Sequence, residues 1–205
     1  MLISEKSLNP LGLGSVHALS ERHSVVTALA RFFRISLSRG KSLITVKDEL
    51  EHVRNYLMIQ QMRFKNKFTY TIESDDEVLE LASLKLMLQP LVENAVSHGL
   101  EGKLGHGTVR IIVENSDRTF FLRVRDDGVG MPDEQVERLN AQFGGVGGAD
   151  MTQPCGGIAL RNVNSRIRLM FGEDYGLHLF SAAGVPPGVL FAFPSRYWFT
   201  IGRSR

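Results

Sequence analysis

The chain has 205 residues, of which 43% are hydrophobic and 22% are charged. This composition allows one sizeable core and excludes a disordered chain. The 24 basic and 22 acidic residues give a net charge of +2, and no basic block interleaved with aromatic residues indicates nucleic-acid binding. A single cysteine excludes an internal disulfide, and no apolar run is long enough for a membrane span. We therefore expect a soluble, cytoplasmic protein with no membrane segment in this chain.

The N-terminal part is expected to contain two helices. Residues 1–15 are rich in glycine and proline, which predicts poor order. From Val16 to Leu37 the apolar residues form a broad helical stripe, which needs a partner: the rest of this chain or a second copy. Thr45 followed by Asp48 predicts an N-cap for a helix that runs to Met62. We interpret the two helices as an appendage preceding the main domain.

The main domain alternates predicted strands and helices. Strands are indicated by alternating, β-prone runs at residues 68–73, 108–114, 119–126, 176–181 and 188–193. Helices are indicated at 88–99, 132–142 and 157–171, the last with Ile158, Leu160, Val163, Ile167 and Leu169 apolar and Gly172 as its stop. Two strand pairs are joined by short turns, which only antiparallel neighbours can use. We predict an α/β fold: a two-layer sandwich with a mixed, largely antiparallel sheet and helices on one face.

The segment 88–99 carries three polar residues beside an apolar stripe. The stripe recurs at three- and four-residue spacing in Leu88, Leu91, Val92, Ala95 and Val96. Asn94 and His98 share a neighbouring face and Glu93 lies beside them, so together they could hold a hydrated magnesium ion and orient a phosphate ester. The alternative is an ordinary helix end, with Gly99 as its stop and His98 stabilised by the helix dipole.

Two glycine-bearing segments follow. Asp126-Asp127-Gly128-Val129-Gly130 ends a predicted strand, and Asp126 is placed to accept a hydrogen bond from an amino group such as that of adenine. The alternative there is a β-turn with solvated aspartates. Gly156-Gly157 precedes a predicted helix after a glycine-rich loop, so its backbone N–H groups would favour phosphate. Simple helix capping is the alternative at that position.

The order of these segments resembles the GHKL (Bergerat-fold) ATPase and kinase superfamily. Its N, G1 and G2 boxes match Glu93-Asn94, Asp126-x-Gly128-x-Gly130 and Gly157-x-Ala159-Leu160. More narrowly, four motifs are similar to those of LytS-type sensor histidine kinases: the segments 49–57, 60–64, 88–99 and 161–167. The resemblance covers roughly residues 30 to 195.

The resemblance implies a protein histidine kinase, a two-component signal-transduction transferase that uses ATP and Mg²⁺. Glu93 would polarise the attacking group, His98 would lie near the phosphates, and residues 132–156 would form the ATP lid. Asn94 would coordinate magnesium and Asp126 would read the adenine amine. The remaining nucleotide-binding positions implied by the boxes are Gly128, Gly130, Gly157 and Leu160.

The resemblance also implies partners and domain limits. The kinase would pass its phosphate from a histidine to a response regulator, would form a homodimer through its N-terminal helices, and would belong to a membrane-bound parent. The expected limits are 1–64 for the N-terminal segment and partial dimerisation helices, 65–197 for the ATP-binding domain and 198–205 for a tail.

The sequence departs from the family pattern in three places. The family's phosphoacceptor histidine follows an Asn-Pro pair, whereas Asn9-Pro10 is followed here by Leu11. The chain is therefore expected to lack the family's acceptor, and His17 and His23 are the nearest histidines. Ala159 replaces the second glycine of the third box, and Val189 stands where the family often has threonine. Two alternatives follow: an ATPase-type conformational module in which Glu93 activates water, and a nucleotide-binding scaffold without kinase activity.

Overall fold

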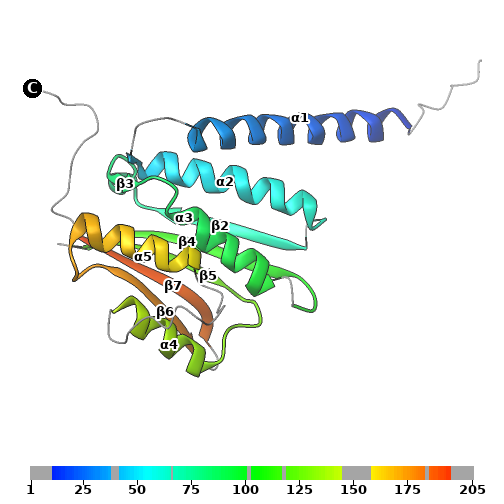
Figure 1. Ribbon diagram of the computed structural model, residues 1–205. Helices are drawn as coiled ribbons and strands as arrows, with labels where there is room; N and C mark the ends of the chain where they lie inside the picture. Colours follow the sequence, from blue (N-terminus) through cyan, green and yellow to red (C-terminus); the bar gives the residue numbers. More distant parts are fainter. Residues whose placement is uncertain are drawn as a thin grey trace, which may run out of the picture.

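A five-stranded mixed sheet forms one layer of the molecule (Figure 1). The computed structural model describes residues 11–37, 42–65, 67–100, 103–116, 119–144, 158–182 and 185–194. The sheet has the order β2-β4-β5-β7-β6, and only β2 and β4 pair in parallel. Its strands are β2 Phe68–Ser74, β4 Gly107–Ser116, β5 Thr119–Asp126, β6 Gly176–Ala182 and β7 Val185–Pro194. The predicted mixed, largely antiparallel sheet is confirmed.

Helices cover one face of this sheet: α2 Val46–Arg63, α3 Leu88–Asn94, α4 Asp133–Phe143 and α5 Ile158–Phe171. Along β4, Val109, Ile111 and Val113 are buried, whereas the intervening Arg110 is exposed. Because successive side chains of a strand point to opposite faces, this alternation means that one face packs on helices and the other is open. The expected two-layer α/β class is confirmed.

The helix α3 belongs to the connection between the two parallel strands. Between β2 and β4 the chain forms the 3₁₀ turn Asp76–Val78, the short strand β3 Ala82–Leu84, α3, and the π-helix η2 Ala95–Leu100. Parallel strands need such a crossover, and its helix must lie over the sheet. A second short strand, β1 Leu43–Thr45, pairs antiparallel with β3. Neither short strand was expected from the sequence.

The helix α2 shares the core of the sheet. Its N-cap is as predicted, since Thr45 Oγ1 accepts a hydrogen bond from Asp48 N at 3.0 Å. The apolar side of α2 packs in the same core as β4 and β5 through Val46, Leu50, Val53, Tyr56 and Leu57. The helix is therefore part of the core and not an appendage to it. The expected limits 1–64, 65–197 and 198–205 stay predictions, and residues 195–205 lie outside the described part.

The first helix, α1 Leu11–Ser36, lies along α2 (Figure 1). It begins at Leu11, so the expectation of poor order is wrong for residues 11–15, and residues 1–10 lie outside the described part. Relative to alanine, a glycine destabilises a helix by roughly 1 kcal/mol. The 26-residue helix α1 tolerates two of them, Gly12 and Gly14. The broad apolar stripe divides: Ala28, Phe32 and Ile35 lie toward α2, whereas Val26, Leu29, Phe33 and Leu37 are exposed.

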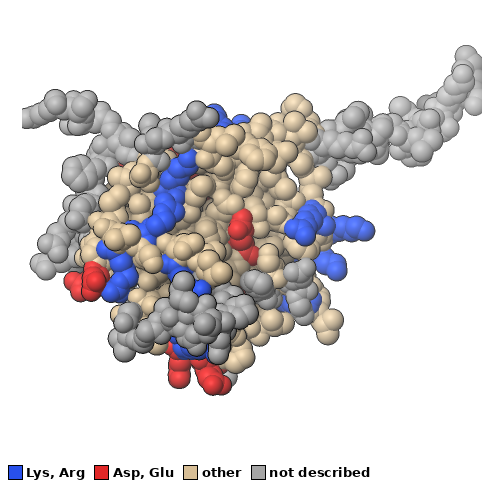
Figure 2. All heavy atoms as spheres, in the orientation of Figure 1, with Lys and Arg blue, Asp and Glu red and all other residues tan. Residues whose placement is uncertain are grey.

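The last helix, α5, departs from the expected apolar pattern at both ends. Leu160, Val163 and Ile167 are buried, but Ile158 and Leu169 are 63% and 88% exposed. Those two lie off the narrow side that faces the sheet. Gly172 ends the helix as predicted, with a positive φ of 105°. Figure 2 shows lysine and arginine side chains in a band over the region of α5.

In the part of the chain that the structure describes, no helix combines the length and the apolar character that a membrane crossing requires.

Candidate functional site

The helix α3 and the π-helix η2 carry the first polar group. The predicted stripe is confirmed, since Leu88, Leu91, Val92, Ala95 and Val96 are all buried. Glu93 and Asn94 are half-buried at its rim, where α3 gives way to η2. Gly99 does not stop the helix, because η2 continues to Leu100. Short π-helical turns occur frequently at functional sites, which favours a site over a simple helix end.

Two expected site residues lie outside what the structure describes. His98 belongs to η2, but its side chain is not described, and Gly157 lies in the undescribed segment 145–157 together with the second half of the expected lid. Leu160 is buried in the core in the first turn of α5. The side chain of Val189, in β7, is likewise not described. The roles assigned to these residues stay predictions.

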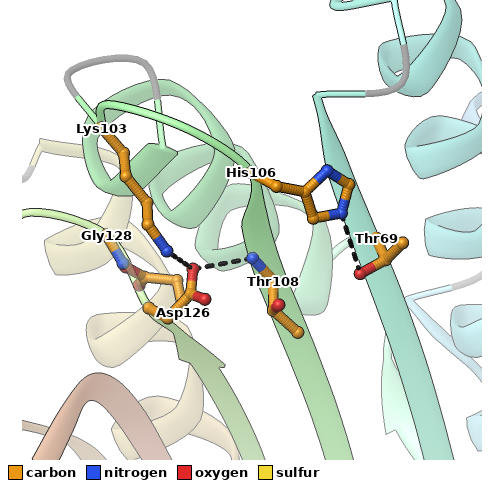
Figure 3. Close-up of polar contacts among 7 residues, drawn as sticks. Thr69, Lys103, His106, Thr108, Asp126 and Gly128 are labelled. Carbon is orange, nitrogen blue, oxygen red and sulfur yellow. Dashed lines mark hydrogen bonds and ion pairs between the residues drawn. The ribbon is translucent and has the colours of Figure 1, made fainter.

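The second polar group lies where β5 ends. Asp126 is half-buried, and its Oδ1 accepts a hydrogen bond from Gly128 N at 3.0 Å (Figure 3). Gly130 has a positive φ of 72°, a conformation that favours glycine and explains that residue in the turn. Burial raises the pKa of the Asp126 carboxyl to about 6. A carboxylate that makes one backbone hydrogen bond can still accept further donors from a ligand.

The neighbouring Asp127 connects three segments of the chain. Its Oδ1 accepts a hydrogen bond from Thr108 N at 2.7 Å and lies 2.8 Å from Lys103 Nζ. Figure 3 labels Thr108 and Lys103, whose dashed lines meet at this oxygen. Burial works to raise the pKa of Asp127, but the contacts with Lys103 and Thr108 outweigh it, so the pKa lies below its ordinary value. Asp127 thereby ties the start of β4 and the segment after η2 to the end of β5, beside Asp126. Sequence reasoning assigned no role to Asp127 or Lys103.

Side chains of α2 hold α3 in place. The carboxylate of Glu49, fully buried, accepts a hydrogen bond from Met87 N at 2.5 Å, at the N-terminus of α3. Burial raises the pKa of Glu49 to about 7. Farther along α3, Glu93 Oε1 accepts a hydrogen bond from Gln89 Nε2 at 2.6 Å. Glu49 and Gln89 stand in the family motifs quoted above, and the four-residue spacing of Gln89 and Glu93 could have indicated their contact.

Two asparagines anchor the edge strand β6 to α4 and α5, the helices on either side of the undescribed segment 145–157. Asn140 of α4 accepts from Leu179 N and donates to the carbonyl of Leu179, both at 2.8 Å. Asn164 of α5 accepts from Leu177 N at 2.9 Å and donates to the carbonyl of Phe143 at 3.1 Å. The end of α4 is thus bonded directly to α5. The first half of the expected lid 132–156 is therefore a helix that is fixed relative to the sheet.

The oxygen ligands available at the end of α3 fit a divalent cation that is bound partly by the protein and partly by a substrate. Among the residues that the structure describes, no three or more His, Cys, Asp or Glu side chains converge to hold a metal ion. Magnesium characteristically takes one or two protein ligands and completes its shell with phosphate oxygens and water. The half-buried amide of Asn94, at the C-terminal end of α3, is an oxygen donor of this kind.

Comparisons of the sequence identify relatives. A family model described as histidine kinase matches residues 11–68, and one described as histidine kinase-, DNA gyrase B-, and HSP90-like ATPase matches residues 80–184. The sensor histidine kinase YesM of Bacillus subtilis is 33% identical over 172 residues, and YpdA of Escherichia coli is 34% identical over 166. The sensor protein LytS of Oceanobacillus iheyensis is 33% identical over 165 residues. These matches cover 80–84% of this chain but 27% of each relative.

Comparisons of the structure agree with this fold. The catalytic domain of the histidine kinase ThkA has a TM-score of 0.54 at 16% identity and covers 74% of this chain and 94% of its own. The histidine kinase domain of EL346 from Erythrobacter litoralis has a TM-score of 0.54 at 14% identity. That match covers 94% of this chain and 91% of the EL346 chain. ThkA in complex with the response regulator protein TrrA has a TM-score of 0.51 at 14% identity. That match covers 98% of this chain and 55% of the ThkA chain. The chain belongs to the histidine kinase-, DNA gyrase B- and HSP90-like ATPase family, and within that family its sequence is similar to sensor histidine kinases, LytS among them.

Proposed function

We propose that this chain binds ATP with Mg²⁺ and transfers the γ-phosphate to a histidine, from which a response regulator receives it. The observation that carries the proposal is the half-buried Asp126 carboxylate at the end of β5, held by the backbone of Gly128 and followed by a turn at Gly130. Family membership supports the same reading of this position. The chain spans 27% of the length of the curated relatives, so the activity of a whole sensor kinase is part of the proposal.

Adenine recognition is assigned to Asp126. The exocyclic amine of adenine is a donor, and the carboxylate of Asp126 accepts only while it is ionised. Gly128 and Gly130 keep the turn free of bulky side chains, so a flat base can approach its backbone. The ion pair of Asp127 with Lys103 fixes the adjacent backbone and leaves Asp126 to contact the base.

Phosphate chemistry is assigned to the C-terminal end of α3. Asn94 would hold Mg²⁺, which neutralises charge on the phosphates when it is bound. A nitrogen of the acceptor imidazole attacks the γ-phosphorus, the bond to the bridging oxygen breaks, and ADP leaves. Glu93 accepts a hydrogen bond from the other ring nitrogen and so makes the attacking nitrogen more nucleophilic. His98 and the backbone at Gly157, ahead of Leu160, are proposed to contact the phosphates. Within the predicted lid 132–156, the part that follows α4 is proposed to close over them.

If the acceptor histidine belongs to this chain, we propose that it lies on α1. With Leu11 after Asn9-Pro10, the candidates within the chain are His17 and His23, of which His23 is exposed. The four exposed apolar residues of α1 support a homodimer through this helix, because a soluble protein rarely exposes such a stripe without a partner. We further propose a cytoplasmic location as the C-terminal part of a longer membrane-bound sensor.

The test begins with calorimetry of the chain with ATP and Mg²⁺, followed by incubation with γ-labelled ATP. Binding that Asp126→Asn weakens strongly, together with acid-labile and base-stable label on protein, is the expected result. Mapping the label decides between His17, His23 and neither. Release of free phosphate without labelled protein, lost in Glu93→Ala, would instead indicate an ATPase module. The absence of both binding heat and thermal shift would contradict the proposal and leave a scaffold.

A further inference from the structure

The carboxylate of Glu93 is held by its neighbour on α3. Gln89 lies one helical turn earlier, and its Nε2 donates to Glu93 Oε1 at 2.6 Å. Both side chains are half-buried. This hydrogen bond restricts the rotation of the carboxylate and fixes which oxygen remains for a ligand. A carboxylate that contacts a reacting group is more effective when its orientation is already fixed, because small misplacements of catalytic groups lower the rate strongly.

The amide of Gln89 is fixed in turn by His52 of α2. His52 Nε2 lies 2.8 Å from Gln89 Oε1. Since a carbonyl oxygen only accepts, the proton of the imidazole must sit on Nε2, and the amide is oriented with its NH₂ group toward Glu93. Burial lowers the pKa of His52, which favours the neutral ring over the protonated one. The hydrogen bonds therefore run in one direction, from His52 through Gln89 to Glu93.

The other side of the His52 ring is covered by α1. Phe32 stacks on it with ring centroids 4.4 Å apart and an angle of 14° between the planes. Tyr56 of α2 lies near the same phenylalanine, with centroids 6.3 Å apart. His52 has no exposed surface, so the ring depends on the position of α1 for both its burial and its orientation.

A buried histidine destabilises the folded state unless its N–H group makes a hydrogen bond. His52 Nδ1 is buried without a hydrogen-bond partner among the residues that the structure describes. Leaving a polar atom unsatisfied destabilises the folded state, and an apolar side chain stacked on Phe32 would avoid that penalty. The feature of histidine that this site uses is the Nε2–H group directed at Gln89.

We propose that Gln89 and His52 are positioning residues that aim the Glu93 carboxylate, and that α1 acts on the site through the stacking of Phe32 on His52. The proposal rests on the role of Glu93 given under Proposed function. It makes α1 a control element for phosphoryl transfer as well as a carrier of candidate acceptor histidines. A displacement of α1 along α2 would release the His52 ring, then the Gln89 amide, and then the carboxylate.

Kinetics of four variants of the full chain test the hydrogen-bonded connection. Gln89→Met removes hydrogen bonds at a nearly constant volume. His52→Phe removes the hydrogen bond and keeps an aromatic ring against Phe32, although the new ring is larger. We expect each to lower the maximal rate of γ-phosphate removal from ATP by about tenfold or more without changing the ATP concentration at half-maximal rate. His52→Gln, which restores an N–H donor, should recover most of the rate. Gln61→Met is the matched control, because Gln61 of α2 bonds the carbonyl of Phe68, away from Glu93.

A spectroscopic readout tests the same connection without any turnover. Nitrogen-15 resonances should show His52 as the Nε2–H tautomer, and the carbon-13 signal of the Glu93 carboxyl should shift in Gln89→Met, His52→Phe and Phe32→Leu but not in Gln61→Met. An Nδ1–H tautomer, or a Glu93 signal that ignores all three changes, would overturn the positioning proposal. Calorimetry of the unaltered chain with ATP separates the two ideas: a chain that fails to bind ATP contradicts the proposed function, whatever the Glu93 signal does.

Discussion

Two adjacent aspartates at the end of β5 have pKa values shifted in opposite directions. Asp127 is paired with Lys103, and its pKa lies below the ordinary value, so it stays charged and ties together the backbone around it. Asp126 has no such cation as its dominant neighbour, and burial raises its pKa to about 6. The environment therefore gives one carboxylate a structural task and leaves the other able to bind a ligand.

The raised pKa of Asp126 predicts a pH dependence of base recognition. As the pH falls through about 6, the carboxylate takes up a proton and loses its acceptor character, so the affinity for adenosine should fall by up to about tenfold per pH unit. Adenosine is the suitable ligand because it has no phosphate to titrate. Asp126→Asn should bind weakly with a flat profile between pH 5 and 8, and a wild-type profile that is equally flat would contradict the assignment.

The buried carboxyl of Glu49 predicts a pH dependence of stability. Its pKa is raised from 4.5 to about 7, so its contribution to stability is complete below pH 4.5 and is lost as the pH rises through 7. The loss amounts to about 3 kcal/mol, since one pKa unit corresponds to about 1.4 kcal/mol. Urea unfolding between pH 4.5 and 8 measures it. Glu49→Gln should remove this component, whereas Glu51→Gln, at a less buried position on the same helix, should retain it.

At the scale of elements, β6 depends on side chains of two helices. Asn140 and Asn164 provide hydrogen bonds to its backbone that an edge strand would otherwise lack on that side. Gly176 makes this possible, because a Cβ there would lie 2.5 Å from Asn164 Oδ1. The helices α4 and α5 therefore position β6 as well as cover the sheet.

Loss of Asn164 should destabilise this arrangement strongly. Asn164→Ala leaves the buried Leu177 N–H without its partner and removes a donor from the carbonyl of Phe143, so we expect a decrease of about 2–4 kcal/mol in the free energy of unfolding. Gly176→Ala should disturb the same contact from the strand side. Chemical denaturation measures both, and Ser165→Ala, exposed on the same helix, is the control. A change below 0.5 kcal/mol in Asn164→Ala would show that these bonds are dispensable.

The sequence predicted elements where the signals are local. The N-cap at Thr45, the β4–β5 hairpin and the stop at Gly172 each depend on a few consecutive residues, and all three are found. It could not predict the three-residue strands β1 and β3, which are too short to show a period, or the π-helical extension of α3. The contact of His52 with Gln89 joins positions 37 residues apart, and no local pattern specifies which distant side chain meets a buried imidazole.

At the scale of the whole molecule, α1 has two apolar sides with different neighbours. Ala28, Phe32 and Ile35 are covered within the chain, whereas the opposite side is open. Hydrophobic periodicity indicates that a surface is buried but does not say by what. The broad stripe therefore left both partners possible, and the structure shows that α2 covers only one side of it.

The open side of α1 predicts self-association through Val26, Leu29, Phe33 and Leu37. A charge in this stripe would have to be buried between two copies, so Leu29→Glu and Phe33→Glu should each shift the molar mass in light scattering from dimer toward monomer. Circular dichroism should remain unchanged because both residues are solvent-exposed in the single chain. Arg31→Glu, exposed on α1 outside the stripe, is the control. A wild-type chain that is monomeric at high micromolar concentration would contradict the prediction.

The bonding of Phe143 to α5 also bears on how this fold can vary. Asn164 and Arg168 both donate to the Phe143 carbonyl. The end of α4 is therefore held against α5, and the connection between the two helices starts and ends at fixed points. Closing a connection between fixed points loses entropy only logarithmically with length, about 0.6 kcal/mol for each doubling. Insertions or deletions between residues 144 and 158 should therefore leave the sheet and its helices almost unaffected. Under the proposed function this connection covers the nucleotide, so changes in its length could alter nucleotide choice or the rate of release at little cost to folding.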